Sequence, residues 1–405
     1  MRSLPFPYAV RNLFRSPLRL LLILGGSTLV VLLVLASTAF VTGMQQSLGV
    51  SGSADNVILL GSGSEESIER SQIAMRTATI ASASIPGIRT RLGVPYVSPE
   101  IHQAMLVKLD PDEPEGRRSV IRGVTSAAFL VHPQVRIVEG RAPEPGRNEL
   151  LAGSLAAAKL GLKPDDLASG STLYIDDVPF VISGRFEAPQ SVMDAELWCP
   201  LTDLQIIAQR DTLSCVILTL EGKGAGASEG TRGASSGGGG GFADVEAFAA
   251  QRLDLELAAL PEREYYSKLA LFFAPIRLMV IITAALIALG GVFGGLNTLY
   301  AAFAARVREL GTLQVLGYRR LAIVVCLLQE SLLVNAAGAL VASIIAILIF
   351  DGVAIRYSMG AFGLVVDGSV LAAGMLAGLL LGVVGAIPPA WRCLRLPIPE
   401  ALKAA

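Results

Sequence analysis

Apolar residues gather in four long runs, at 18–41, 272–301, 321–350 and 368–388, and polar sequence separates them. A helix rises about 1.5 Å per residue, so the first run reaches ~36 Å, enough to cross a hydrocarbon core about 30 Å thick. The first run could instead be a cleaved signal peptide, because it contains small residues at 36–39 where processing could occur. The apolar core of a signal peptide is only about 7–15 residues long, however, which favours an anchor. The pattern therefore predicts four transmembrane α-helices.

The longest polar stretch, 42–271, lies between the first and second spans and predicts a large extracytoplasmic domain. Short alternating apolar segments and short helical segments within it indicate an α+β fold. One hairpin is expected to turn at Asp176-Asp177. Cys199 and Cys215 fall in strands that we expect to be adjacent, where a disulfide could form in an oxidising compartment. The Gly/Ser-rich run 222–241 predicts a flexible insert on the surface of this domain.

Basic residues indicate the orientation of the chain. Arg2, Arg11, Arg15 and Arg19 precede or begin the first span, which predicts a cytoplasmic N-terminus. Residues 1–17 are expected to form an amphipathic interfacial helix, or else a plain basic flank that only orients the next segment. Counting the spans then places 302–320 in the cytoplasm, 351–367 in a short outer loop, and the tail 389–405 in the cytoplasm. Both termini are expected inside.

The cytoplasmic segment 302–320 combines charge with helical spacing. Leu310, Leu313 and Leu316 recur at helical intervals, and Gly317 is placed to stop the helix. The positive charges lie at the two ends of this segment and are opposed only by Glu309; they belong to Arg306, Arg308, Arg319 and Arg320. The pattern predicts a short amphipathic helix with cationic ends and an apolar ridge. The alternative is a positive loop that only sets topology.

The segment from Arg306 to Arg320 has the pattern Arg-x-Arg-Glu-Leu-Gly-x-Leu-x-x-Leu-Gly-x-x-Arg, which resembles the cytoplasmic loop of MacB/FtsX-type (type VII) ABC transporter permeases. Gln314 and Val315 stand where that family usually has a basic residue followed by Ala. The resemblance implies that this loop is a coupling helix that docks on a separate ATPase. The residues carried over to that role are Arg306, Arg308, Glu309, Leu310, Gly311, Leu313, Leu316, Gly317, Arg319 and Arg320.

Three further stretches carry the same resemblance. The run YAVRNLFRSPLRLLLILGG is similar to the start of these permeases, and 138–205 is similar to the MacB-type periplasmic core domain. Within it Gly140-Arg141, Gly184 and Glu196-Leu197-Trp198 fall in the family's order. The tail PPAWRCLRLPIPEALKA resembles the family's ending, although Pro397-Ile398-Pro399 replaces the usual Asp-Pro.

The resemblance implies a permease subunit in the bacterial inner membrane. It implies a homodimer, or a heterodimer with a sister permease, joined to two ATPase subunits that bind ATP-Mg, and in some members a periplasmic adaptor. ATP-driven movement would pass to the outer domain for export or extraction of a hydrophobic substrate. The alternative is an FtsX-like mechanotransmitter that transports nothing and regulates an envelope hydrolase.

Two features inside the spans are candidates for special roles. Glu330 places a carboxylate well within an apolar run, where it should face protein or water and find a partner. It could couple protons, make a mechanical contact, or brace the cytoplasmic end through a salt bridge or hydrogen bond; we favour the brace. Small residues at helical spacing permit close helix packing, either between subunits or within one. They are Gly290, Gly291, Gly294 and Gly295 in the second span and Gly374, Gly378 and Gly382 in the fourth.

Composition and motifs argue against binding of nucleic acid, metal or nucleotide and against catalysis by this chain. The chain has 405 residues, is 52% hydrophobic and 17% charged, and has a net charge of −1, so it has no general attraction for nucleic acid. Its four cysteines and two histidines show no metal-ligand spacing. There is no G-x-x-x-x-G-K-[ST] sequence and no catalytic set with a convincing spacing. We therefore expect a membrane subunit that is not itself an enzyme and has no cofactor of its own.

Overall fold

The structure is a computed structural model that describes residues 6–221, 241–357 and 360–395. The predicted insert 222–241 lies outside the described residues except for Gly241, and so does the end of the predicted tail, 396–405. The chain divides into two compact units. A helical unit comprises 1–42, 275–353 and 364–405, and an α/β unit comprises 43–274 and 354–363.

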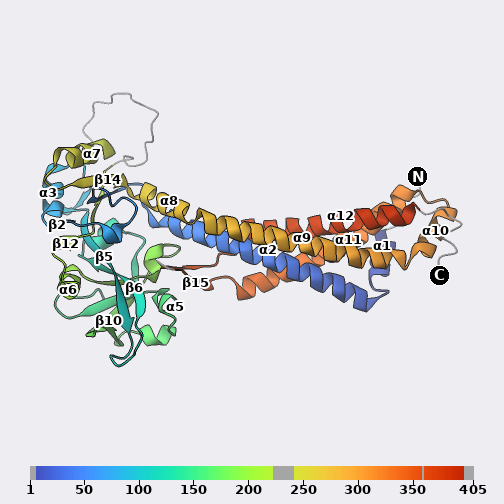
Figure 1. Ribbon diagram of the computed structural model, residues 1–405, viewed down its shortest axis with the longest axis horizontal. Helices are drawn as coiled ribbons and strands as arrows, with labels where there is room; N and C mark the ends of the chain where they lie inside the picture. Colours follow the sequence, from blue (N-terminus) through green and yellow to red (C-terminus); the bar gives the residue numbers. More distant parts are fainter. Residues whose placement is uncertain (1–5, 222–240, 358–359, 396–405) are drawn as a thin grey trace. The chain divides into compact units, whose positions relative to one another are not determined.

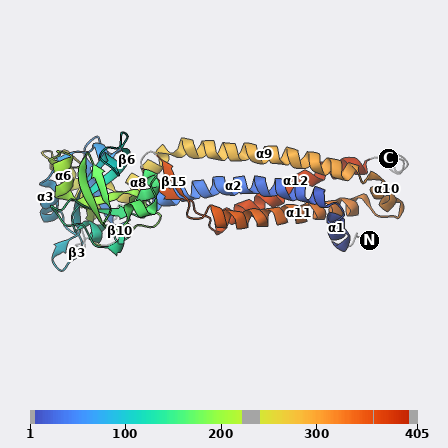
Figure 2. The ribbon, with the colours of Figure 1, turned by 90° about the horizontal axis from the view of Figure 1, so that it is seen from below.

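Long helices make up the helical unit. Among the described residues, four are long and apolar enough to cross a membrane. They run side by side in the ribbon (Figures 1 and 2) and are α2 (Pro17–Ser51), α9 (Ala274–Ala304), α11 (Arg320–Ile349) and α12 (Gly368–Leu394). Two short helices complete the unit, α1 (Phe6–Leu13) and α10 (Val307–Val315).

Two of these helices are longer than hydropathy alone predicts. Helix α2 continues about ten residues past position 41, because its polar continuation, with Gln45 and Gln46, still favours helix although it no longer favours lipid. Helix α12 continues through Pro388-Pro389 to Leu394, where we expected the span to end at 388. A proline removes hydrogen bonds and bends a helix without always ending it.

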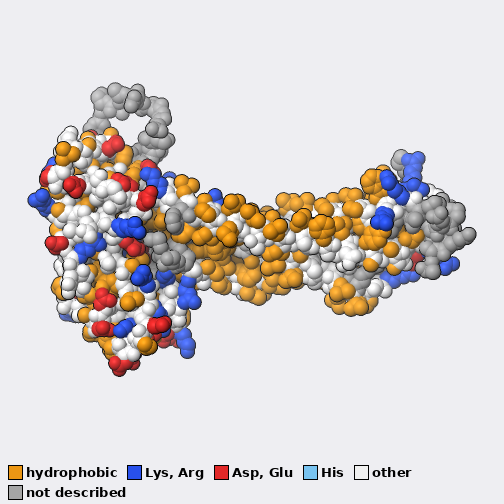
Figure 3. Space-filling model, in the orientation of Figure 1, with side chains coloured by type: hydrophobic (Ala, Val, Ile, Leu, Met, Phe, Trp, Pro, Cys, Tyr) orange, Lys and Arg blue, Asp and Glu red, His pale blue; other side chains and the backbone are white. Residues whose placement is uncertain are grey.

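The helical unit exposes many apolar side chains. Leu21, Leu286, Phe293, Leu348 and Leu380 are each more than half exposed, and apolar atoms cover much of the visible face of these helices (Figure 3). A water-soluble protein rarely exposes so large a continuous apolar surface. Together with the length of the helices, this surface is that of a membrane-spanning bundle.

The α/β unit is built on one mixed sheet, which has ten strands within the described residues. Most neighbours are antiparallel, and two pairs are parallel: β6 (Arg117–Val124) with β11 (Leu197–Pro200), and β8 (Glu149–Gly153) with β10 (Val178–Glu187). The strand order is β14 (Leu257–Pro261), β1 (Asn56–Gly61), β13 (Cys215–Thr219), β5 (Val97–Lys108), β6 (Arg117–Val124), β11 (Leu197–Pro200), β8 (Glu149–Gly153), β10 (Val178–Glu187) and β7 (Arg136–Gly140), with β9 (Thr172–Ile175) beside β10 and β5.

Short helices cover this sheet and close its core. They are α3 (Thr77–Ser84), α4 (Ala128–Val131), α5 (Ala156–Leu160), α6 (Leu201–Ile207), α7 (Phe242–Gln251) and α8 (Glu262–Phe272), with 3₁₀ turns η1 (Ile68–Arg70), η2 (Pro164–Leu167) and η3 (Val192–Ala195). Small pairs of strands are β2 (Ile73–Ala74) with β12 (Thr212–Leu213), and β3 (Thr90–Arg91) with β4 (Val94–Pro95). The expected α+β domain is confirmed.

The predicted hairpin between β9 and β10 is confirmed. Ile175 pairs with Val178, so Asp176 and Asp177 are the two turn residues. Both have positive φ, 45° and 66°, as a type I′ turn requires. Aspartate tolerates this conformation better than most residues with a side chain, which explains why the sequence signal was readable.

The expected outer loop 351–367 contains regular structure of its own. It contains the antiparallel strand pair β15 (Ala354–Tyr357) and β16 (Gly360–Gly363), and both strands belong to the α/β unit. Ala361 and Phe362 are buried, and a side chain at Gly161, which ends α5, would collide with the Arg356 guanidinium. The segment between the third and fourth spans thus packs on α5 and η3.

The expectation that Cys199 and Cys215 lie in adjacent strands is wrong. Cys199 is on β11 and Cys215 on β13, and β5 and β6 lie between these strands. Three strand spacings of about 4.8 Å separate the two chains by ~14 Å, whereas a disulfide needs Cα atoms within about 7 Å. Both cysteines are buried free thiols, and burial raises the pKa of each above its ordinary value.

Candidate functional site

Helix α10 forms within the predicted segment 302–320 and is closed by a complete C-terminal cap. The amide of Gly317 donates to the Gln314 carbonyl, and the amide of Tyr318 donates to the Leu313 carbonyl. This pair of bonds is the Schellman arrangement, which requires a residue with positive φ, and Gly317 has φ +90°. Gly317 ends the helix because, lacking a Cβ, it adopts this positive φ without a steric clash.

One face of α10 is packed into the bundle. Val307, Leu310 and Gly311 are buried, and Leu313 is half-buried. They join a cluster that includes Phe303 of α9 and side chains of α11 and α12: Ile323, Leu327, Ala386, Ala390 and Leu394. This packing fixes how α10 sits against the three long helices that it touches.

The opposite face of α10 and the turn after it are exposed. Val315 and Leu316 are each 61% exposed. Arg308, Arg319 and Arg320 are also exposed, and blue side chains gather near this end of the helical unit (Figure 3). Of the three leucines expected to form one ridge, Leu310 therefore faces inward and Leu316 faces outward. We refer to Arg308, Val315, Leu316, Arg319 and Arg320 as the α10 surface.

Glu330 lies behind α10 and is only 5% exposed. It accepts hydrogen bonds from Asn12 Nδ2 at 2.9 Å and from Arg306 Nη2 at 2.8 and 3.0 Å. Asn12 is on α1, Arg306 directly precedes α10 and Glu330 is on α11, so one carboxylate joins three elements. Arg306, which we expected at an ATPase contact, instead turns inward with its side chain 11% exposed.

A second ion pair ties the turn after α1 to α10. Arg15 Nη1 lies 2.6 Å from Glu309 Oε1, and both side chains are partly exposed. Sequence reasoning gave neither Asn12 nor Arg15 a role in bracing α10. A signal for Asn12 was present, because it lies three residues after Ala9 and so shares the buried face of α1, where a polar amide needs a partner.

The two glycine stripes behave differently. On α12, a side chain at Gly374 would meet Leu35, at Gly378 would meet Ala339, and at Gly382 would meet Leu332, so this stripe packs within the chain. On α9 only Gly291 does so, against Val30. No atom of another described element lies within 4 Å of a Cβ placed at Gly290, Gly294 or Gly295.

A second group of buried charges lies in the α/β unit. Arg122 donates to both oxygens of Glu196 at 2.7 and 2.8 Å and to Glu100 at 2.9 Å. Trp198 Nε1 donates to Glu196, and the Arg122 guanidinium lies over the Trp198 ring. Its positive charge helps to hold the pKa of both carboxyls below the ordinary value, although burial acts in the opposite direction.

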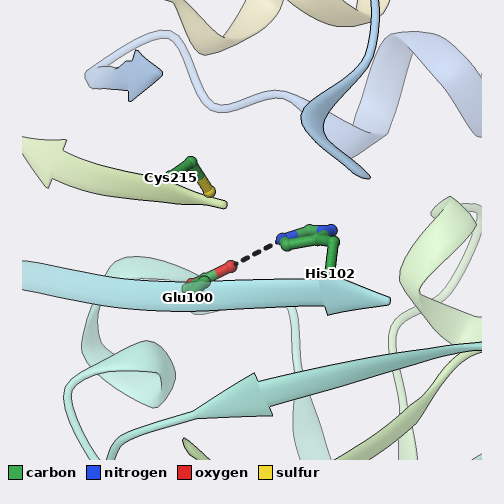
Figure 4. A group of neighbouring side chains, drawn as sticks. All are labelled: Glu100, His102 and Cys215. Atoms are coloured by element: carbon green, nitrogen blue, oxygen red, sulfur yellow. Dashed lines mark hydrogen bonds and ion pairs between the residues drawn. The ribbon is translucent and has the colours of Figure 1, made fainter. Parts of the chain in front are cut away.

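Glu100, His102 and Cys215 bring potential metal-ligand atoms within 4.8 Å of one another (Figure 4). The oxygens of Glu100 are already used, however. Oε1 accepts from Ser98 and His132, and Oε2 accepts from Arg122 and His102. A divalent cation here would also stand against the Arg122 guanidinium, at a high electrostatic cost. We therefore assign this cluster to a hydrogen-bonded charge network and not to a metal centre.

Comparison with protein families identifies both halves of the chain. The MacB-like periplasmic core domain matches residues 20–227, which is half of the chain, and the C-terminal domain of FtsX-like permeases matches residues 281–398. The chain belongs to the MacB/FtsX-type ABC transporter permeases. The resemblance stated from the sequence is confirmed, and the permease is a multi-pass inner-membrane protein of a family whose members work with an ABC ATPase.

Solved structures of two related regions are similar to the permease. One is the periplasmic region of MacB from Actinobacillus actinomycetemcomitans, with 10% identity and a TM-score of 0.37 over 54% of this chain and 94% of that one. The other is the extracellular domain of the noncanonic ABC-type transporter YknZ from Gram-positive bacteria, with 14% identity and a TM-score of 0.31 over 41% of this chain and 84% of that one. No curated protein matches the sequence significantly.

Proposed function

We propose that this permease couples ATP hydrolysis by a separate ATPase subunit to movement of its periplasmic core domain, for export or extraction of a hydrophobic substrate. The observation that carries the proposal is the α10 surface. It presents two exposed apolar side chains, Val315 and Leu316, beside three exposed arginines. An apolar centre with a charged rim is the usual composition of a protein docking site.

The way α10 is held supports a mechanical role. Its inner face is packed on α9, α11 and α12, Glu330 ties it to α1, and Glu309 ties it to the turn after α1. A force applied to the α10 surface would therefore reach several helices at once, because a packed and hydrogen-bonded contact transmits displacement instead of absorbing it. In this proposal Glu330 is a brace that holds α1, α10 and α11 together.

The open glycines of α9 support a dimer. Gly290, Gly294 and Gly295 leave backbone accessible on a membrane helix, and in lipid such faces pack closely against other helices. We propose that this face meets a second copy of the permease or a sister permease.

An alternative follows from the FtsX-like half of the chain. A permease of this family could transport nothing and switch an envelope hydrolase through its outer domain. The match of residues 20–227 to the MacB-like periplasmic core favours the first proposal, since that match covers most of the outer domain.

The test is affinity purification of the full tagged permease in mild detergent, with identification of the proteins that accompany it. The proposal predicts an ABC ATPase in near-equal amount, together with an adaptor if the system exports. Recovery of a cell-wall hydrolase with the ATPase would favour the regulatory alternative. Recovery of the intact permease without an ATPase would contradict the coupling proposal.

A further inference from the structure

The α/β unit contains two buried polar atoms that face each other without a hydrogen bond. His132 Nδ1 and Glu262 Oε1 face each other at 3.8 Å, and both side chains are completely buried. Neither atom makes a hydrogen bond with any described residue. A buried polar atom without a partner costs about 1–3 kcal/mol, so a native fold seldom keeps two of them face to face.

The hydrogen bonds around His132 determine which ring nitrogen carries its hydrogen. His132 Nε2 is 3.0 Å from Glu100 Oε1. Glu100 also accepts from Arg122 Nη1 at 2.9 Å, from Ser98 Oγ at 2.8 Å and from His102, so it is a carboxylate that can only accept. Nε2 of His132 must then carry a hydrogen, and a ring with that single hydrogen presents a bare lone pair at Nδ1.

With Glu262 ionised, that lone pair would face a second acceptor. The other oxygen of Glu262, Oε2, already accepts from Ser53 N at 2.8 Å and from Asn56 Nδ2 at 2.9 Å. One proton placed on either His132 Nδ1 or Glu262 Oε1 turns the unfavourable contact into an attractive one. We propose that His132 and Glu262 form a site that binds one proton between them.

The position of this site gives the proton a structural role. Helix α2 ends at Ser51 and Ser53 follows it, whereas Glu262 is the first residue of α8. The backbone at these two points is in close contact, because a Cβ on Gly52 would lie 2.8 Å from the Arg263 Cα. Glu262 thus joins the segment by which the chain enters the α/β unit to the segment by which it leaves. We call this contact between residues 52–53 and 262–263 the clasp, and in this proposal the proton sets its strength.

The buried charges around the pair favour uptake of a proton. Without the proton, the buried carboxylates Glu100, Glu196 and Glu262 outnumber Arg122, the buried cation beside them. The groups that face the pair from the elements packed around it are Glu100 and His102 on β5, Arg122 on β6, Glu196 before β11, Cys215 on β13 and Tyr266 on α8.

Burial raises the pKa of Glu262 above its ordinary value, although His132 and two hydrogen bonds oppose the change. The folded unit therefore binds this proton more tightly than the unfolded chain does. The bound proton contributes its full stabilisation of the folded unit below the ordinary carboxyl pKa. This contribution is lost as the pH rises through the raised pKa of Glu262 in the folded unit. The clasp should be strongest at acidic pH and should weaken toward alkaline pH.

The variant Glu262→Gln tests the site, because an amide reproduces the protonated acid at every pH. Its oxygen can accept from Ser53 and Asn56, and its NH₂ group can donate to His132 Nδ1. The full-length permease in detergent is heated at several pH values from 5 to 8.5, with Glu264→Gln, on the exposed face of the same helix, as control. We expect Glu262→Gln to match the wild type at pH 5 and to melt about 2–4 °C higher at pH 8.5. A difference that does not change with pH would overturn the proposal.

Hydrogen exchange provides a second readout that does not depend on melting. The amide of Ser53 is bonded to Glu262. Wild type and Glu262→Gln are compared at the same pH by mass spectrometry of a peptide spanning residues 50–60, so that the intrinsic pH dependence of exchange cancels. Slower exchange in the variant at pH 8.5, with equal exchange at pH 5, supports the clasp. Equal exchange at both pH values overturns it.

Discussion

The two units of the permease differ in how far their charged groups and their packing surfaces find partners within the same chain. In the α/β unit, Arg122 and its two carboxylates are buried, and every oxygen of Glu100 and Glu196 is bonded. The helical unit also buries a carboxylate, Glu330, but leaves the glycines of α9 and the α10 surface uncovered. The difference indicates where partners are needed, since the two carboxylates bound to Arg122 are satisfied inside the α/β unit, whereas the helical unit leaves whole faces uncovered.

The largest expected effect comes from breaking the network of the α/β unit. Arg122→Leu leaves Glu100 and Glu196 buried without their cation, and removing one partner of such a pair costs about 3–5 kcal/mol. We expect the outer domain to unfold at much lower denaturant concentration and to become sensitive to protease in the full-length protein. Arg118→Leu, on the exposed face of the same strand, is the matched control and should have little effect. Equal stability of the two variants would show that the network is not structural.

Substitution of one glycine from each stripe sharpens the contrast within the helical unit. Gly378→Leu forces a side chain into Ala339, and overpacking of this kind costs about 1–3 kcal/mol. At Gly294, by contrast, a Cβ has no described atom of another element within 4 Å, so Gly294→Leu should disturb its own subunit less. We expect the first variant to lower thermal stability in detergent, and the second to keep the fold while reducing the dimer seen by cross-linking. A Gly294→Leu protein that stays fully dimeric would exclude this face of α9 as the seam.

Glu330→Gln tests whether the membrane carboxylate is a brace. The change removes the charge that compensates Arg306, which should lower stability by about 1–3 kcal/mol. Glu309→Gln removes a more exposed pair with Arg15, which should cost no more than about 1 kcal/mol. Because a brace carries no proton, ATP-dependent activity of the wild type should be the same with and without a proton gradient. Activity that disappears when the gradient is dissipated would instead assign proton coupling to Glu330.

Sequence alone predicted the elements whose signal is local. Apolar runs located the four long helices, Asp176-Asp177 located a turn, and Gly317 lies where α10 is capped. Each of these depends on residues that are neighbours in the chain. The ends of α2 and α12 were less predictable, because hydropathy reports the thickness of lipid and not the length of a helix.

Features that depend on distant pairing were missed or wrong. The order of strands in the sheet cannot be read from the chain, so Cys199 and Cys215 were expected side by side although two strands separate them. The strand pair β15–β16 was not foreseen, because its packing on α5 joins segments nearly two hundred residues apart. Glu330 was recognised as needing a partner, but Asn12 lies 318 residues away and could be named only from the structure.

The measurement that tests the account most directly is the ATP hydrolysis rate of the copurified complex with the α10 surface altered. Leu316 is exposed, so Leu316→Asp should leave the fold and the membrane insertion intact, whereas Leu313→Asp would also disturb the packed face. Leu316→Met keeps an apolar side chain of similar volume and is the matched control. The account predicts that Leu316→Asp abolishes stimulation of the ATPase by the permease and that Leu316→Met preserves it. Full stimulation by a correctly folded Leu316→Asp permease would contradict the account.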